Sequence, residues 1–147
     1  LHALARPVAE ALTKAGLPFQ QAGHDPIRET DGLDFTADRI SLLSMHAAKG
    51  LEFPAVFIIG LEEDIIPYHP PGKDPADKEE ERRLFFVAVT RAKRHLFLTR
   101  SEVRTLFGRK FKPKPSPFLN EISTNLKTLD SLPKRRPDLK ARQFTLF

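Results

Sequence analysis

Residues 40–60 read ISLLSMHAAKGLEFPAVFIIG, and this stretch decides the fold. Two short apolar runs that are rich in β-branched residues, 40–45 and 55–59, flank a polar segment at 46–52. Runs of this length and composition are typical of strands in the interior of a parallel sheet. The stretch therefore predicts two central parallel strands, with polar groups held at the point where the first strand ends.

The polar segment between the two runs has the chemistry of a ligand-binding turn. Gly50 and its small neighbours allow the backbone to approach a ligand closely, and we expect the turn to start a helix whose N–H groups can face a phosphate. His46 and Lys49 add hydrogen-bond donors, and Glu52 can accept hydrogen bonds from a sugar hydroxyl. Taken singly, each of these residues also fits an ordinary surface turn.

A second informative stretch, residues 78–92, reads KEEERRLFFVAVTRA and predicts a helix. Its apolar residues recur at helical spacing, and Asp77 is a candidate N-cap before an acidic first turn. We expect an ion pair between Glu79 and Arg83, which are four residues apart. Packing is expected to hold Arg91 and to point its guanidinium off the helix end, where a rigid arginine can contact a transferring phosphoryl group.

The remaining elements complete an α/β pattern. An amphipathic helix is expected over 5–15, a loop over 24–38, a strand over 95–99 and a short helix over 116–126. Strands that alternate with helices indicate a parallel sheet with helices on its faces.

Composition excludes several classes of protein. The chain has no Cys, so neither a disulfide framework nor a thiolate metal site is available, and its five His residues lie too far apart for a metal site. No apolar stretch reaches the roughly 18 residues that span a bilayer. We therefore expect a soluble, cytoplasmic protein that binds no metal of its own and has no membrane contact.

The net charge of +5 is unevenly distributed along the 147 residues. Residues 1–100 hold 13 Lys and Arg against 15 Asp and Glu, whereas residues 101–147 hold 11 against 4. A basic, Pro-containing tail can bind a polyanion, and it can equally be a solvated linker. We expect one packed domain over 1–126 and a flexible basic tail over 127–147.

Together, 40–60 and 80–92 resemble the fifth and sixth motifs of the UvrD/Rep/PcrA family of superfamily-one DNA helicases. The resemblance rests on the H-x-x-K-G-L-E-F core of the first stretch and the E-E-R-R-L-F-x-V-A-x-T-R-A run of the second. Residues 9–19 and 116–122 are similar to the piece after the fourth motif and to the segment that closes the second motor domain. The resemblance implies a RecA-like second motor domain of a helicase that moves 3′ to 5′ along single-stranded DNA.

The same resemblance assigns roles to individual residues. It implies that ATP binds between this domain and an N-terminal motor domain, with Arg91 as the arginine finger and Glu52 as the contact to the ribose. Gly50 would lie in the ATP site. His46 and Lys49 would face single-stranded DNA and link it to that site.

The chain departs from the family pattern in three ways, one of which is that the Arg of the fourth motif is expected just before Leu1 and so falls outside this sequence. It contains no G-x-x-x-x-G-K-[ST] phosphate loop and no acidic magnesium-binding motif, so we expect no ATP hydrolysis by this chain alone. The N-terminal motor domain would hold the magnesium ion. Only residues 20–39 occupy the place of the family's accessory domain, which is therefore absent or removed.

The last five residues resemble the Q-x-x-L-F peptide that docks on the bacterial sliding clamp. Gln143, Leu146 and Phe147 match its defined positions, at the end of a charged tether. A tail that folds back or stays disordered is the alternative.

Two other functional interpretations stay open. The first is a non-catalytic module with a RecA-like fold that binds nucleic acid or the clamp; such a module has no need of a finger and a ribose acceptor. The second is a nuclease-linked helicase of the AddA/RecB type, which shares the motifs, although a chain of this length is expected to hold no nuclease domain.

Overall fold

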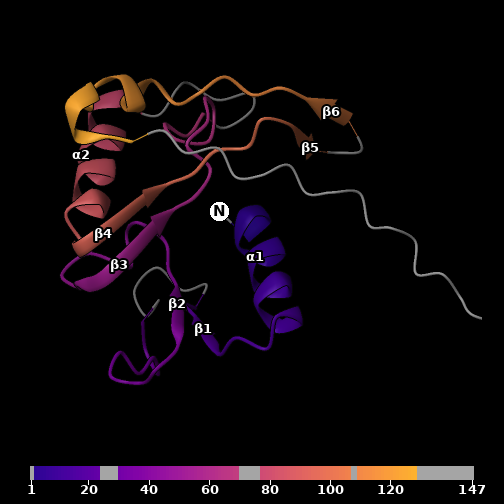
Figure 1. Ribbon diagram of the computed structural model, residues 1–147, viewed down its shortest axis with the longest axis vertical. Coiled ribbons are helices and arrows are strands. Elements are labelled where there is room, and N and C mark those ends of the chain that lie inside the picture. Colours follow the sequence, from indigo (N-terminus) through magenta and orange to yellow (C-terminus); the bar gives the residue numbers. More distant parts are fainter. Residues whose placement is uncertain (1, 24–29, 70–76, 107–108, 129–147) are drawn as a thin grey trace, which may run out of the picture.

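The computed structural model describes residues 2–23, 30–69, 77–106 and 109–128, and this part of the chain is a mixed helix and strand structure (Figure 1). The elements, in chain order, are α1 (His2–Lys14), β1 (Phe19–Gln21), β2 (Ile40–Leu42), β3 (Phe53–Ile58), α2 (Lys78–Val89), β4 (Ala92–Leu98), β5 (Arg104–Leu106), β6 (Arg109–Phe111) and the 3₁₀ helices η1 (Pro117–Asn120) and η2 (Thr124–Leu126).

The first four strands form parallel pairs, as the sequence predicted. Strand β1 pairs with β2, and β3 pairs with β4. The expectation of central strands was wrong for the described residues, because each of these strands has a single partner there. Phe57 and Phe97 are 63% and 45% exposed, and their rings stack 4.3 Å apart on the outer face of the β3–β4 pair. That pair is therefore buried on one face rather than on both.

The hydrophobic core lies on the inner face of β3 and β4, where α2 and η1 cover it (Figure 1). Ile58 of β3, Phe85 and Ala88 of α2, and Phe118 of η1 are buried together. In the second half of each strand the inward positions, Val56 and Ile58 of β3 and Leu96 and Leu98 of β4, alternate with the exposed Phe57 and Phe97, as expected for a sheet with one buried face. The helix predicted over 78–92 is confirmed as α2.

Helix α1, predicted over 5–15, is confirmed, and its first half packs against the end of β3. A Cβ atom placed on Gly60 would lie 2.7 Å from Leu4 Cδ1, and Gly60 has a φ of +78°. Only glycine permits both this close approach and this backbone conformation without strain. A small pocket of about 190 Å³ lies beside the contact, and Pro7, Thr99 and Arg104 are among its lining residues.

The helix predicted over 116–126 was wrong: the structure has η1 and η2 instead. Pro117 occupies the first turn of η1, and the Ser116 side chain accepts a hydrogen bond from the Phe118 amide. The Ser116 amide also donates to the Leu61 carbonyl at 2.9 Å, so a long-range contact sets the path of the segment. The antiparallel pair of β5 with β6 was not predicted. The domain boundary at residue 126 stays a prediction.

Candidate functional site

The turn after β2 is a single helical turn that leads into a strand. The Ala47 amide donates to Ser44 Oγ at 3.0 Å and the Ala48 amide to the Ser44 carbonyl at 3.1 Å. Gly50, with a φ of +83°, ends the turn, and β3 follows. The expectation that a helix starts here was wrong, because the left-handed backbone of Gly50 reverses the chain after one turn.

This turn presents His46 and Lys49 to solvent. Both side chains are exposed, and the two residues are joined by a hydrogen bond of 3.1 Å from the Lys49 amide to the His46 carbonyl. A Cβ atom on Gly50 would have no atom within 4 Å, so the space above its backbone is open to a ligand. The turn can therefore offer two donors and an accessible stretch of backbone.

Arg91 follows Thr90, the C-cap of α2, and its guanidinium folds back over the end of that helix. Its Nε donates to the Val87 carbonyl at 3.0 Å, its Nη1 to the Leu51 carbonyl at 3.2 Å and its Nη2 to Thr90 Oγ1 at 3.0 Å. The side chain is held, as predicted, but it does not point off the helix end. It contacts the backbone of the other motif segment instead.

Glu52 and Arg91 occupy equivalent places at the starts of two neighbouring strands. Phe53 pairs with Ala92, so the residue that precedes each of them lies at the same edge of the β3–β4 pair. Glu52 Oε2 is 3.4 Å from Lys93 Nζ, and these side chains are 55% and 56% exposed. Because the pair is largely solvated, it contributes little to stability and both groups stay accessible.

Lys93 was not predicted from the sequence as a site residue. Glu52 lies beside Arg91 across the strand pair, because Phe53 pairs with Ala92. Lys93, two residues after Arg91, points to the same face and so reaches Glu52. Its position two residues after Arg91 was the one signal that the sequence offered.

The edge that carries Glu52, Arg91 and Lys93 can bind a ligand with both acidic and hydroxyl groups. Two cations suit phosphate oxygens, and the carboxylate suits a hydroxyl donor. No cluster of His, Asp or Glu within the described ranges could hold a metal ion. In the same part of the chain, no helix is long and apolar enough to cross a membrane.

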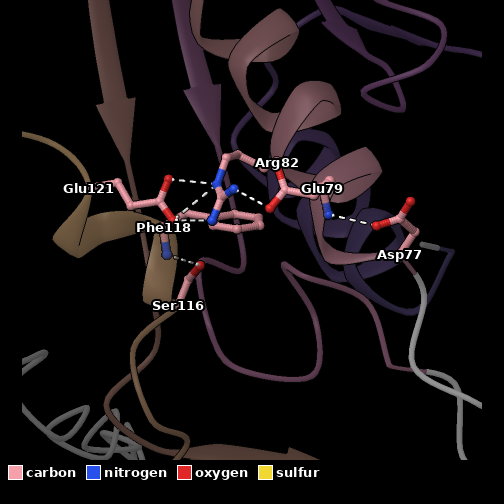
Figure 2. Close-up of polar contacts among 6 residues, drawn as sticks. All are labelled: Asp77, Glu79, Arg82, Ser116, Phe118 and Glu121. Carbon is pink, nitrogen blue, oxygen red and sulfur yellow. Dashed lines mark hydrogen bonds and ion pairs between the residues drawn. The ribbon is translucent and has the colours of Figure 1, made fainter.

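Helix α2, which ends at this edge, is fixed at its other end by Arg82 (Figure 2). Arg82 donates to both carboxylate oxygens of Glu121 and also pairs with Glu79, while its guanidinium lies 6.0 Å from the centre of the Phe118 ring. We call this group the Arg82 clamp. The predicted pair of Glu79 with Arg83 was wrong, because Glu79 turns to Arg82.

The first turn of α2 is capped as the sequence predicted. The Asp77 side chain accepts a hydrogen bond of 2.9 Å from the Glu79 amide (Figure 2). Arg83 pairs with Glu80 at 3.4 Å, and both side chains of this pair are more than 70% exposed.

A buried ion pair outside the candidate site was also missed. Glu62 is fully buried and accepts two hydrogen bonds of 2.6 Å from Arg104, and one of 2.8 Å from the Ser101 amide. Burial alone would raise the pKa of Glu62, but the hydrogen bonds and the charge of Arg104 outweigh it and hold the pKa below its usual value. The same contact raises the pKa of Arg104.

The predicted peptide for the bacterial sliding clamp has three defined residues, Gln143, Leu146 and Phe147, and all three lie outside the described residues.

Comparison with known proteins gives a family match over the segment that holds this site. Residues 27–103 match the model of the UvrD-like helicase C-terminal domain. The chain is 49% identical over 89 residues to the ATP-dependent DNA helicase PcrA of Bacillus subtilis, an overlap that covers 60% of this chain and 12% of the relative. The PcrA helicases of Staphylococcus epidermidis and Leuconostoc citreum are 48% and 47% identical over 98 and 102 residues, which cover 65% and 69% of this chain. The aligned part spans 13% of each of these two relatives.

Proposed function

Because the chain belongs to the family of UvrD-like helicase C-terminal domains, we propose that it forms the second motor domain of an ATP-dependent DNA helicase or translocase that moves 3′ to 5′. Its relatives by sequence are described as ATP-dependent DNA helicases. The proposal gives this segment a share of the ATP site and of the single-stranded DNA site. It assigns the phosphate loop and the magnesium ligands to an N-terminal motor domain of the same protein, in the cytoplasm.

One observation supports this proposal above all others. The hydrogen bond of Arg91 Nη1 with the Leu51 carbonyl joins the end of α2 to the segment that contains Glu52. The two stretches that resemble the fifth and sixth motifs therefore meet at one edge of the β3–β4 pair. A nucleotide site needs this meeting, because its phosphates and its ribose must be contacted together.

Each residue then has a defined task. Arg91 donates to oxygens of the transferring phosphoryl group, and Glu52 accepts from a ribose hydroxyl. Gly50 lets the backbone lie close to the nucleotide. His46 and Lys49 contact the phosphates of single-stranded DNA from the exposed face of the turn. Magnesium, when bound with ATP, neutralises charge on the β- and γ-phosphates.

The test of Arg91 is the substitution Arg91→Ala in the complete helicase. We expect DNA-stimulated ATP turnover to fall by on the order of 10³ or more, the scale associated with arginine fingers, while DNA binding is retained. Arg83→Ala is the matched control, because Arg83 is 75% exposed and pairs with Glu80, which is 71% exposed. Turnover that survives Arg91→Ala would contradict the assignment.

A mixing experiment distinguishes the motor-domain hypothesis from that of a non-catalytic binding module. ATP hydrolysis stimulated by single-stranded DNA is measured for this chain alone, for the N-terminal motor domain alone and for the two combined. Activity only in the combination supports a motor site divided between two domains. Inactivity of the combination and of the complete protein favours the non-catalytic module.

We also propose that Gln143, Leu146 and Phe147 dock on the bacterial sliding clamp. A peptide with two apolar anchors at the end of a charged tether can reach a groove on a partner at little cost in folding. This would place the helicase at sites of DNA replication or repair.

A further inference from the structure

At the end of α2 the Val87 carbonyl lacks its α-helical partner. In a continuing α-helix the Arg91 amide would donate to the Val87 carbonyl, but here it donates to the Ala88 carbonyl at 3.2 Å. Two side chains replace that donor: Thr90 Oγ1 at 2.8 Å and Arg91 Nε at 3.0 Å both donate to the Val87 carbonyl. The last turn of the helix thereby holds both side chains in place.

The Thr90 hydroxyl also has a second contact. Its proton is directed at the Val87 carbonyl, so its lone pairs are available to accept, and Arg91 Nη2 donates to them at 3.0 Å. Of the three acceptors of the guanidinium, the other two are backbone carbonyls, of Val87 and Leu51. Thr90 therefore supplies the one side-chain contact that orients this group among those described.

These contacts leave the guanidinium able to bind a ligand. It has five N–H groups, and the three hydrogen bonds use one on each nitrogen. One N–H remains on each of Nη1 and Nη2, which is what a bidentate contact with a phosphate requires. The side chain can thus be held and donate at the same time.

We propose that Thr90 is a positioning residue for Arg91. Its hydroxyl, oriented by the Val87 carbonyl, sets the plane of the guanidinium and so the direction of the two remaining N–H groups. The inference rests on the proposed function, because it gives Thr90 a part in ATP turnover only through Arg91. Thr90 itself contacts no nucleotide in this arrangement.

The test compares Thr90→Val, which keeps the shape but lacks the hydroxyl, with Thr90→Ser, which keeps the hydroxyl. Thr13→Val is the matched control. Thr13 lies in α1, and its Oγ1 makes the same kind of hydrogen bond to a helix carbonyl, at 2.9 Å from the carbonyl oxygen of Ala9. In the complete helicase we expect Thr90→Val to lower kcat for ATP by about tenfold or more, the loss expected when one hydrogen bond to a charged group is removed. KM for ATP should change little, and Thr90→Ser and Thr13→Val should keep a kcat close to that of the unsubstituted protein.

A second readout needs no activity. In this chain, the Nε–H signal of Arg91 in a ¹⁵N NMR spectrum, assigned by its loss in Arg91→Lys, should exchange slowly with water. Exchange should speed up in Thr90→Val and stay slow in Thr90→Ser.

The outcomes separate this inference from the function on which it rests. An unchanged kcat and an unchanged signal in Thr90→Val, with turnover lost in Arg91→Ala, would overturn the positioning role and leave the proposed function standing. A loss of kcat in Thr90→Val that is matched by Thr13→Val would show a general effect on folding, and would also overturn it. Full turnover in Arg91→Ala would overturn both.

Discussion

Glu62 is a charged residue that is buried together with a partner of opposite charge. Its carboxylate has no exposure, yet both oxygens are bonded to Arg104, which is itself only 16% exposed. A carboxylate taken out of water is costly unless a partner of opposite charge and good geometry replaces the lost hydration. The pair ties the segment after β3 to the first residue of β5, because Glu62 and Arg104 lie 42 positions apart in the sequence.

The substitution Glu62→Gln tests this pair. Because it leaves Arg104 buried without its counter-charge, we expect the free energy of unfolding near neutral pH to fall by about 3 kcal/mol or more. Urea titrations of this chain measure the change. Glu63→Gln is the control, since Glu63 is 44% exposed and lies 3.5 Å from the exposed Lys114. We expect this substitution to change the free energy of unfolding little.

The same pair makes a contribution that depends on pH. Because the pKa of Glu62 is lowered in the folded state, the stabilisation is fully present above the unfolded value near 4.5 and is lost as the pH falls through the folded-state pKa. The difference in stability between the unsubstituted chain and Glu62→Gln should therefore shrink in acid. A difference that stays constant from neutral pH into acid would contradict the assignment.

Among the elements, α2 depends on the short η1 for its position. The Phe118 side chain is only 1% exposed and stacks with Phe85 of α2, with 5.5 Å between ring centres. The guanidinium of the Arg82 clamp lies against the Phe118 ring (Figure 2). Because Arg91 follows Thr90, the C-cap of α2, the packing of η1 also helps to fix the candidate site.

We expect Phe118→Ala to lower the free energy of unfolding by about 3–5 kcal/mol, the usual cost of removing a fully buried phenylalanine. Phe86→Ala is the matched control on α2, because Phe86 is 66% exposed and leaves no cavity when it is shortened. Urea unfolding of the two variants gives the comparison. Equal losses would mean that η1 does not hold the helix.

The elements also show which features a sequence can predict. The helix α2 was predicted because its cap, its acidic first turn and its apolar spacing are all local properties. The choice of strand partners was not, since Phe53 pairs with Ala92 across a long stretch of chain. The helix expected over 116–126 failed for the same reason, because a distant carbonyl and a buried Phe118 determine its path.

The residues of the candidate site also fall into those that the sequence predicts and those that it does not. Arg91 and Glu52 were identified from their motifs, and the structure places them at one edge. Lys93 and Thr90 were missed, because their roles arise from side-chain contacts that no local pattern encodes.

For the whole molecule, the contrast is between a near-neutral body and a strongly basic end. Residues 101–147 hold 11 Lys and Arg against 4 Asp and Glu. A chain with this charge distribution can bring a terminal peptide to a partner while its body is engaged elsewhere.

Deletion of residues 143–147 in the complete helicase should abolish binding to the sliding clamp and leave DNA-stimulated ATP turnover unchanged, because the peptide lies far along the chain from Arg91. Affinity for purified clamp is measured with both forms of the protein. Replacement of Leu146 and Phe147 by Ala should reproduce the deletion, whereas Thr145→Ala should not. Affinity for the sliding clamp that survives the deletion would contradict the proposal that this peptide docks on it.

The bond from Arg91 Nη1 to the Leu51 carbonyl has a consequence for the energetics of the proposed motor. Leu51 directly follows the turn that presents His46 and Lys49, so a shift of that turn on binding a DNA strand alters the contacts of the guanidinium. Coupling free energies between two sites are reciprocal. A DNA strand that raises the affinity of the protein for ATP must therefore itself bind more tightly, by the same factor, when ATP is bound. The two affinities are then two measurements of one equilibrium.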